Sequence, residues 1–541
     1  METGPSSPHR IAIVVPAKRL QFLAGLLWIQ RYGPLQVASC LRDAGYRVQL
    51  FNEELGARVT AAELAAEYDI VGFSSKTCAM SRATQLARQV KAEAAALGRA
   101  VTTILGGEHA CMCAGAQLPE CFDHVLAGEA EEFCVALVNA LQQGDNGSIE
   151  TLTHGAAGEL RTCRSFDNIP DLSLVAGYKQ TTSSFLFRYA RPLWIAKNRR
   201  FPMLSFQGSR GCPYGCAFCP TPSYLQGRHY RRRSGESAAA CLKEHIAYSG
   251  ISRVMFEDPT AALPFDPESH QFFSCLAKHA IPMRASVLVR IDLCHDRELL
   301  TIMRAAGVTN LSIGIESLSD ETRRDFKKKI SDATILQSID VFRQYGFSLT
   351  GLFIVGYDTD DLNSFDRIER FIHQTGIERW RVSPITQMPE ADGQFMPAYR
   401  FFLWDELDRF GRDLIDYTNG EFVLFFPMRL KPSELQQKIF QFNRSSTSFA
   451  GALKMFPKRR QLMPLLQRCG HNLAHQLTDR QPAIADFIRM LREVEGPFYA
   501  QSNGRLQLNE ELLRERIQRR GPGRPCHERS PAAAIGLGRI G

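Results

Sequence analysis

Three cysteines near the middle of the chain have a spacing that suits the binding of a metal cluster. Cys212, Cys216 and Cys219 form the pattern C-x3-C-x2-C. Cysteine thiolates hold iron–sulfur clusters, and clusters that only carry electrons are usually closed by four cysteines. Three thiolates leave one iron of a four-iron cluster without a protein ligand, so a small molecule can bind that iron directly. The spacing therefore predicts a [4Fe–4S] cluster at which chemistry takes place.

A zinc knuckle, or a set of ordinary buried thiols, is the alternative interpretation of these cysteines. Zinc sites favour paired C-x2-C units and a fourth Cys or His ligand. His229 is the nearby candidate for that fourth ligand. The spacing of the three cysteines favours the iron–sulfur cluster over zinc.

The length and composition predict a large globular protein with several domains. The chain has 541 residues, of which 44% are hydrophobic and 23% are charged, and about 150 residues per domain gives three or four units. No apolar run approaches the ~18 residues of a membrane span, and residues 1–10 lack the pattern of a signal peptide. The 15 cysteines are an odd number, which is typical of reduced thiols. We therefore expect a cytoplasmic protein without a transmembrane segment.

The charge pattern does not favour nucleic-acid binding. The formal net charge is +8, and much of the excess lies in local runs at residues 231–233 and 514–524. Runs of this kind are usually solvated surface or basic tails. We expect no nucleic-acid partner, and we expect the tail at residues 520–541, rich in Gly, Pro, Arg and Ala, to be disordered.

The N-terminal part of the chain alternates between short apolar runs and amphipathic stretches. We expect helices at residues 35–44 and 81–97. We expect strands at residues 11–15, 47–51, 70–74, 101–105 and 124–127. Strands that alternate with helices of this length form βαβ units, and these build a parallel sheet with helices on both faces. The pattern predicts an α/β, doubly wound (Rossmann-like) domain over residues 1–145, with a ligand crevice at the carboxyl ends of its strands.

The cysteine motif resembles the signature of the radical S-adenosylmethionine (SAM) enzymes. Arg210 and Gly211 precede the first cysteine, and the aromatic Phe218 precedes the last, as in that family. The resemblance implies that the amino and carboxylate groups of SAM bind the open iron. It also implies that the reduced cluster splits SAM to methionine and a 5′-deoxyadenosyl radical, which abstracts hydrogen from carbon.

A second alternating series follows the connector that we expect at residues 146–200. We expect strands at residues 203–206, 253–256, 285–289, 310–315, 348–355 and 381–383. Six such units resemble the partial (β/α)6 barrel of the radical SAM fold, here over residues 201–398, whose reactive groups gather at the carboxyl ends of the strands. Residues 399–519 are expected to form a helical C-terminal region, with its clearest helices at residues 401–417 and 432–442.

The ends of the later strands carry residues that the resemblance places around SAM. Asp258 belongs to an acidic turn that in the family receives the methionine amino group, and Arg290 follows the next strand. Glu316 and Ser317 match the family's Gly-x-Glu-Ser turn, and Gly356 ends a further strand. An ordinary buried ion pair is the alternative role for Glu316. We expect these five residues to contact SAM.

Two later turns depart from the pattern common in the family. Residues 356–360 read Gly-Tyr-Asp-Thr-Asp where many relatives have Pro-Gly-Glu, which resembles hopanoid-methylase-like proteins and class B radical SAM methyltransferases. Residues 388–393 lack the usual Pro-Gly-Thr. The lining of the substrate mouth, and with it the substrate, does not follow from the resemblance.

Two glycine turns ahead of the cysteines resemble the cobalamin-binding domain found in many radical SAM enzymes. Gly-Gly-x-His follows the strand at 101–105, and Gly-Glu-x-Glu follows the strand at 124–127; taken singly, each is more often a tight turn. Glycine would let the backbone approach the cofactor closely. The residues that we expect to contact cobalamin are Ser74, Ser75, Gly106, Gly107, His109, Gly128 and Glu129.

The loop that carries a cobalt-binding histidine in many cobalamin proteins has none here. Residues 16–21 read Pro-Ala-Lys-Arg-Leu-Gln. We therefore expect cobalt without a histidine on its lower face, as in radical SAM members. His109 is expected to pack beside the cofactor.

The resemblance covers roughly residues 10–400 and implies a cobalamin-dependent radical SAM enzyme. The leading hypothesis is methylation of an unactivated carbon, with a substrate radical that takes its methyl from methylcobalamin and a second SAM that restores it. Oxidative cyclisation or rearrangement without methyl transfer is one alternative, and a non-catalytic cobalamin sensor or scaffold is another. No side chain beyond the cofactor ligands is expected to be catalytic. The expected partners are a small-molecule, lipid or peptide substrate and an electron donor such as flavodoxin or ferredoxin.

Several aromatic residues of the C-terminal region have two interpretations. Phe422, Phe425, Phe426 and Phe440 could line an apolar substrate entrance. Aromatics at helical spacing are more often part of a core, and we favour the core interpretation.

Overall fold

A computed structural model describes most of the chain. The described residues are 9–18, 20, 27–112, 119–153, 161–182, 184–191, 193, 195, 201–221, 227–328, 330–386, 398–402, 404–447, 481–502 and 505–520. The expectations for residues 388–393 and 521–541 lie outside them. Within the described residues, no helix combines the length and the apolar character needed to cross a membrane.

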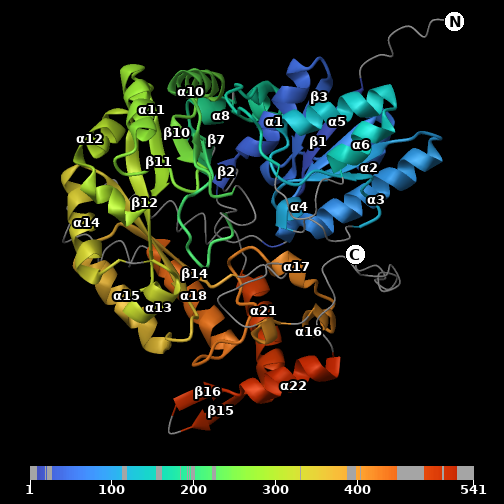
Figure 1. The fold of residues 1–541 in the computed structure, drawn as a ribbon. Coiled ribbons are helices and arrows are strands. Elements are labelled where there is room, and N and C mark those ends of the chain that lie inside the picture. The colour runs from blue at the N-terminus through green and yellow to red at the C-terminus, as the bar shows by residue number, and fades with distance from the viewer. Residues whose placement is uncertain are drawn as a thin grey trace, which may run out of the picture.

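The N-terminal part is a five-stranded parallel sheet with the order β3-β1-β4-β5-β6. Its strands are β1 (Arg10–Val15), β3 (Arg47–Asn52), β4 (Ile70–Ser74), β5 (Thr102–Gly106) and β6 (His124–Val125). Figure 1 shows helices on both faces of this sheet, which confirms the predicted doubly wound fold. These helices are α1 (Tyr32–Asp43), α2 (Ala61–Glu67), α3 (Met80–Ala96), α4 (Glu108–Met112), α5 (Glu131–Gln143) and α6 (Asn146–Thr153).

The alternation of side chains along β1 explains how both faces of the sheet are covered. Ile11 and Ile13 pack with the apolar residues of α1 and α5, whereas Ala12 and Val14 pack with those of α2 and α3. Successive side chains of a strand point to opposite faces, so one apolar run supplies two cores. The first core continues into the second sheet, and the second core continues into the C-terminal helices.

The second sheet is parallel and has the order β14-β13-β12-β11-β10-β7-β2. The six expected strands are present as β7 (Phe201–Phe206), β10 (Arg253–Phe256), β11 (Arg284–Val289), β12 (Val308–Glu316), β13 (Ser348–Val355) and β14 (Arg379–Pro384). The seventh strand, β2 (Leu27–Ile29), was not predicted and pairs with β7. Sequence periodicity cannot identify a strand of three residues.

The helices of the second unit lie along the outer side of its curved sheet (Figure 1). They are α10 (Gly235–Ser249), α11 (Pro267–Lys278), α12 (Arg297–Ala305), α13 (Asp320–Asp325), α14 (Asp332–Gln344) and α15 (Leu362–Thr375). A short antiparallel pair, β8 (Ser209–Arg210) and β9 (Arg231–Arg232), follows β7. The segment with the three cysteines runs between β8 and β9, directly after the first strand of the predicted barrel, and the partial-barrel prediction is confirmed.

The segment between the two sheets packs against both of them. Its described elements are the turn η4 (Leu172–Leu174) and the short helices α7 (Tyr178–Thr182) and α8 (Phe185–Arg188). The Ala176 N–H donates to the Leu50 carbonyl of β3 at 2.8 Å, and the ring of Tyr178 stacks on that of Tyr248 in α10. This segment therefore holds the two units against each other.

The C-terminal region differs from the prediction in one helix. The expected helix at residues 401–417 is wrong: two short helices, α16 (Trp404–Asp408) and α17 (Leu414–Tyr417), replace it. The chain turns at Gly411, which has a φ of +65°, and Asp413 begins α17 by accepting a hydrogen bond from the Ile415 N–H. A left-handed glycine followed by an Asp N-cap ends one helix and begins another.

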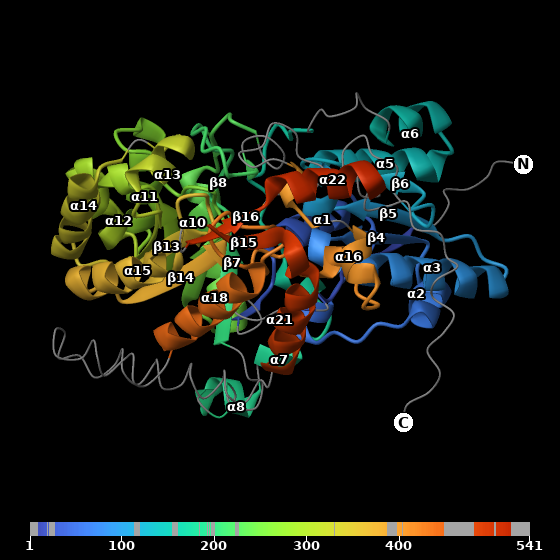
Figure 2. The same ribbon diagram turned by 90° about the horizontal axis from the view of Figure 1, so that it is seen from below.

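The remaining C-terminal elements join the two units. They are α18 (Pro432–Thr447), α21 (Gln481–Glu495), the hairpin of β15 (Tyr499–Ser502) and β16 (Arg505–Leu508), and α22 (Glu510–Arg520). The helix predicted at residues 432–442 is confirmed as α18. Figure 2 shows α21 and α22 in front of the junction of the two units, and Figure 1 shows them below both sheets. The core prediction is confirmed for Phe422, Phe425 and Phe426, which are at most 2% exposed, whereas Phe440 is only partly buried.

Candidate active site

A cavity of about 490 Å³ opens at the carboxyl ends of the N-terminal strands. Its inner wall is apolar and lies between the sheet and the helices α1 and α5, with Ile13, Ile104 and Val138 among its residues. Its mouth carries charged side chains. These are Lys18, Arg31, Glu54, Lys76 and Glu108. An apolar slot with a polar mouth suits a large amphipathic cofactor.

Most of the residues expected to contact cobalamin line this cavity. Ser74, Ser75, Gly106, Gly107, Gly128 and Glu129 all do so. His109 does not line it: its ring is buried, with Nδ1 3.2 Å from the Thr77 hydroxyl. Among the described residues no histidine lines the cavity, and the expectation of cobalt without a histidine below it stays a prediction.

The structure gives the two turn glycines a different purpose from the expected one. Gly107 has a φ of +90°, and a Cβ there would lie 2.8 Å from the backbone N and O of Ser75. Gly128 has a φ of +94°, and its Cβ would lie 2.4 Å from the backbone N of Arg161. Contacts this short are not possible for a real Cβ. The glycines therefore allow neighbouring loops of the protein to meet at the cavity.

The loop with the three cysteines is fixed by backbone contacts. Gly211 has a φ of +80°, and a Cβ there would lie 2.0 Å from the His229 carbonyl oxygen. The Cys212 N–H donates to Gly227 at 3.2 Å, and the Ala217 N–H donates to Phe326 at 3.2 Å. All three cysteines are half-buried and unpaired by disulfides. The loop can therefore present three thiolates to a cluster at the carboxyl end of β7.

Two cations lie beside Cys216. The Nη1 atom of Arg290 is 3.7 Å from its Sγ, and the Arg290 guanidinium also lies 3.8 Å from the centre of the Tyr214 ring. Burial raises the pKa of the Cys216 thiol, and the charges of Lys328 and Arg290 act against that rise. Positive charge at this point favours the thiolate form that binds metal.

Asp258 supports the cysteine loop directly. Its carboxylate is buried and accepts hydrogen bonds from the Gly208 N–H at 3.1 Å and from the Ser209 hydroxyl. Burial raises its pKa to about 6. The side chain is thus directed at the start of the segment that leads to the cysteines, and its expected contact with SAM stays a prediction.

Glu316 ends β12 and forms a buried ion pair with Lys328, with 2.8 Å between the carboxylate and Nζ. Lys328 also donates to the Gly314 carbonyl at 2.7 Å. Ser317 is buried next to Glu316, and its hydroxyl accepts from the Ser319 N–H at 3.1 Å. The ion pair named as the alternative role of Glu316 exists. This ion pair lies near the cysteine loop, since the charge of Lys328 acts against the rise in the pKa of the Cys216 thiol.

Gly356 follows β13 with a φ of +98°. A Cβ there would lie 2.7 Å from the Phe425 ring and 2.8 Å from Leu435. Its N–H donates to the Asp360 carboxylate at 2.9 Å. These contacts are enough to explain why the residue is a glycine. The expected role of Gly356 in binding SAM therefore stays a prediction.

Arg210 connects the cysteine loop with the cavity. It lies two residues before Cys212 and lines the cavity, and it forms buried ion pairs with Glu129 at 3.1 Å and with Glu131. Burial alone would raise the pKa of Glu131, but the charge of Arg210 and the hydrogen bonds from Arg210, Cys163 and the backbone together hold this pKa below its usual value. A second connection joins Arg31 to Glu257 at the end of β10, with 2.8 Å between the charged groups.

Sequence reasoning missed several residues of this site. Lys328 belongs to no motif, whereas Tyr214 and Glu257 stand inside the cysteine motif and the acidic turn but were given no role. Each takes its place through contacts between distant elements. Arg210 was noted only as part of the motif. The signal that could have identified Arg210 is the Gly-Glu-x-Glu turn, whose two carboxylates need a buried cation.

Comparison with known families identifies the two units. Residues 29–138 match the B12 binding domain, and residues 206–372 match the radical SAM superfamily. The chain is therefore a cobalamin-dependent radical SAM enzyme, with a [4Fe–4S] cluster, SAM and cobalamin as its cofactors. The expectation of a [4Fe–4S] cluster is confirmed over zinc, and its attachment to Cys212, Cys216 and Cys219 stays a prediction.

The chain is similar to curated proteins of two activities. It is 23% identical over 352 residues to the bacteriochlorophyllide d C-12(1)-methyltransferase of Chlorobaculum tepidum, covering 63% of this chain and 69% of that protein. It is 24% identical over 419 residues to the anaerobic magnesium-protoporphyrin IX monomethyl ester cyclase of Rubrivivax gelatinosus, covering 72% and 71%. The fold resembles the cobalamin-dependent S-adenosylmethionine radical enzyme OxsB with aqua-cobalamin bound, with a TM-score of 0.59 and 15% identity over 95% of this chain and 80% of that one.

Proposed function

We propose that the protein methylates an unactivated carbon atom of its substrate. Cys212, Cys216 and Cys219 would hold the cluster, Glu316 and Arg290 would bind polar groups of SAM, and the N-terminal cavity would hold cobalamin. When bound, the cluster with SAM supplies a radical that removes hydrogen from carbon, and cobalamin supplies the methyl group. The residues of the chain bind and orient these groups and exclude water.

One observation carries the proposal: the cofactor cavity has walls from both units. Gln207, Arg210, Met255 and Glu257 come from the second sheet and its loops, and the other lining residues come from the N-terminal unit. Arg210 also begins the cysteine loop. A cofactor in this cavity would lie next to the strand ends at which the cluster binds, and transfer of a group between two cofactors needs that proximity.

The relatives support methyl transfer as the first hypothesis. The similar protein from Chlorobaculum tepidum is a methyltransferase, and a shorter alignment of 240 residues, at 25% identity, matches the hopanoid C-2 methylase of Rhodopseudomonas palustris, covering 42% of this chain and 43% of that protein. Because the chain is also similar to the cyclase from Rubrivivax gelatinosus, oxidative cyclisation is the second candidate function. The substrate would belong to a lipid, peptide or tetrapyrrole class that enters at the strand ends.

Nucleoside products distinguish the candidates. The protein would be purified without oxygen, loaded with iron, sulfide and hydroxocobalamin, reduced, and given SAM with a labelled methyl group. We expect both 5′-deoxyadenosine and S-adenosylhomocysteine, the co-product of methyl transfer. Cys212→Ala should abolish 5′-deoxyadenosine, whereas Cys121→Ser, a half-buried cysteine outside the motif, should not change either product.

Each other outcome contradicts the proposal in a different way. 5′-Deoxyadenosine without S-adenosylhomocysteine would favour the cyclase hypothesis. Absence of both nucleosides from protein that carries its full complement of cluster would favour the sensor or scaffold hypothesis.

A further inference from the structure

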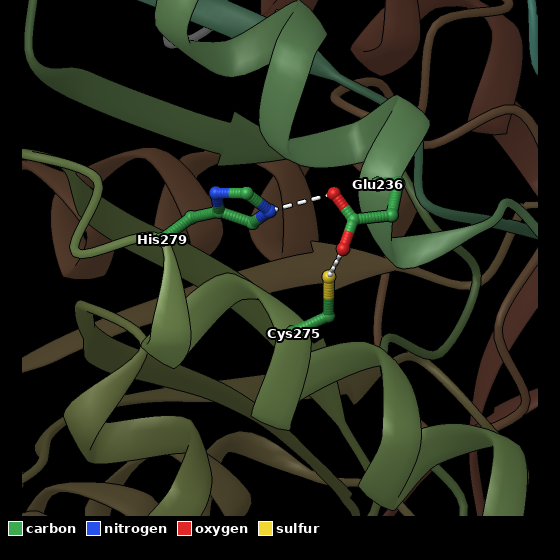
Figure 3. A group of neighbouring side chains, drawn as sticks. All are labelled: Glu236, Cys275 and His279. Carbon is green, nitrogen blue, oxygen red and sulfur yellow. Dashed lines mark hydrogen bonds and ion pairs between the residues drawn. The ribbon is translucent and has the colours of Figure 1, made fainter.

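A second group of metal-binding side chains lies on the outer face of the barrel, away from the cysteine loop. Glu236 belongs to the first turn of α10, and Cys275 and His279 lie one helical turn apart at the end of α11. One ligand atom from each side chain lies within 4.8 Å of the other two. Figure 3 shows the Glu236 carboxylate between the thiol and the imidazole.

Each oxygen of the Glu236 carboxylate has its own hydrogen-bond partner. The Nε2 atom of His279 is 2.7 Å from Oε2 of Glu236, and the Sγ atom of Cys275 is 3.3 Å from Oε1. Zinc bond lengths of about 2.0–2.3 Å place the ligands of a tetrahedral ion roughly 3.3–3.8 Å apart. Small side-chain movements would therefore convert the two hydrogen bonds into three metal–ligand bonds.

We propose that Glu236, Cys275 and His279 bind a zinc ion that joins α10 to α11, with solvent as the fourth ligand. A thiolate with an imidazole selects zinc over magnesium or calcium, which prefer oxygen ligands. The Glu236 side chain is 73% exposed and His279 is 27% exposed, so an ion can reach the site from solvent. The alternative is that the three side chains form only an ordinary ion pair and a thiol hydrogen bond.

The backbone holds the three ligands in place. The His279 N–H donates to the Cys275 carbonyl at 3.1 Å, so the two side chains have helical i, i+4 spacing and lie on one face. A Cβ at Gly235 would lie 2.5 Å from Cβ of Cys275. The glycine thus lets the start of α10, with Glu236 in its first turn, lie directly against Cys275.

Zinc binding would release one proton from this site and move another. The thiol loses its proton to solvent, and the proton on Nε2 of His279 moves to Nδ1 through solvent, so that Nε2 can bind the metal. The other ring nitrogen, Nδ1, lies 3.0 Å from Nζ of Lys243 and then has to donate its own N–H. Ligand histidines normally donate that N–H to an oxygen acceptor, and the Lys243 ammonium cannot accept it. Lys243 therefore opposes zinc binding in the wild-type chain.

The test measures zinc on the protein loaded with its cluster and cobalamin, so that the cluster cysteines are occupied. After removal of loose metal with a chelator, the protein would be dialysed against zinc buffers, and bound zinc measured by mass spectrometry. Zinc-edge X-ray absorption would identify the ligands. We expect one zinc per chain with one sulfur ligand, and a loss of affinity of at least about tenfold in Cys275→Ser and in His279→Ala.

Two further variants make the test specific. Lys243→Gln supplies an oxygen acceptor for the Nδ1 N–H of His279, so zinc should bind several-fold more tightly. This variant keeps the three ligands and therefore stays informative if a ligand variant fails to fold. Cys121→Ser should leave zinc binding unchanged. Unchanged zinc affinity in both ligand variants, a zinc shell without sulfur, or no effect of Lys243→Gln would overturn the proposal.

Discussion

Glu316 has a backbone conformation that residues with a side chain rarely adopt. Its φ is +65°, and its carboxylate occupies the space that a side chain at Gly314 would fill, since a Cβ there would lie 2.1 Å from Oε1. Lys328 donates to both residues. Strained backbone persists where its surroundings fix it and is concentrated at functional sites. This arrangement supports a SAM-binding role for Glu316 beyond that of an ion pair.

Removal of Lys328 should be more harmful than removal of the whole pair. Lys328→Met leaves the Glu316 carboxylate buried without its cation, and we expect a loss of about 3–5 kcal/mol in unfolding free energy. The double variant Glu316→Gln with Lys328→Met should lose less, because no charge stays buried. Thermal melting of the cluster-free proteins measures both changes. Equal losses in the two variants would show that the pair is not electrostatically coupled.

Gly107, which lines the N-terminal cavity proposed for cobalamin, gives a second prediction at the level of single residues. Gly107→Ala introduces a Cβ that would lie 2.8 Å from the Ser75 backbone, so the cavity loop has to move and the affinity for hydroxocobalamin should fall at least tenfold. Gly98 also has a positive φ, +64°, but has no atom within 4 Å of its Cβ position. Gly98→Ala should cost about 1–2 kcal/mol of stability without a change in cobalamin affinity.

The motifs predicted Glu316 and Gly107 correctly as residues of special turns, but not their partners. Glu316 and Gly107 stand in patterns of adjacent residues, which a sequence displays directly. Lys328 and Ser75 meet them only after folding, across 12 and 32 positions of the chain. His109 shows the opposite case: it matches the motif, yet it is buried against Thr77 and outside the cavity lining.

At the scale of elements, the turn after β13 should make stability depend on pH. Asp360 is buried and accepts hydrogen bonds from the Gly356 and Tyr357 N–H groups at 2.9 and 3.1 Å. Burial raises its pKa to about 6, above the value of about 3.9 in an unfolded chain. Between these values the folded chain binds a proton that the unfolded chain has lost, so stability rises as pH falls from about 7 to about 4.

Asp360→Asn should remove this contribution while its side-chain oxygen still accepts both hydrogen bonds. We expect the gain in stability between pH 7 and pH 5 to be smaller in the variant by about 1 kcal/mol. Asp366→Asn, an exposed position on α15, serves as the control with unchanged pH dependence. Melting curves of the cluster-free proteins at both pH values measure the difference, and identical pH profiles for wild type and Asp360→Asn would refute the assignment.

Most strands were predictable because each is a run of apolar residues of ordinary strand length. β4, β10 and β13 have the predicted bounds, and β7, β11, β12 and β14 differ from the prediction by at most two residues at either end. β2 could not be predicted, because three residues carry no periodicity and the strand is fixed by pairing with β7, 174 positions further along the chain. The prediction of one helix at 401–417 was wrong, because the chain leaves the helical conformation at Gly411 and Asp413 caps the start of a second helix.

At the scale of the whole molecule, the cofactor sites of the two units share one buried network. Arg210 pairs with Glu129 and Glu131 and donates to Gln36 of α1 at 3.2 Å. Its guanidinium also lies 4.5 Å from the centre of the Phe166 ring in the connecting segment. The position of the cysteine loop therefore depends on the N-terminal unit, on α1 and on the connector at once.

Arg210→Met should weaken both cofactor sites together. The Glu131 carboxylate stays buried without its guanidinium, and we expect a loss of about 3–5 kcal/mol in stability with lower retention of both iron and cobalamin after gel filtration. Arg489→Met removes an arginine that is 64% exposed, and it should leave the stability and the retention of both cofactors close to those of the wild type. Adding Glu131→Leu to Arg210→Met should recover part of the stability, because no unpaired carboxylate is then left at that position. If cobalamin retention fell while iron retention stayed at the wild-type level, Arg210 would serve the cavity alone and the two sites would not be coupled through it.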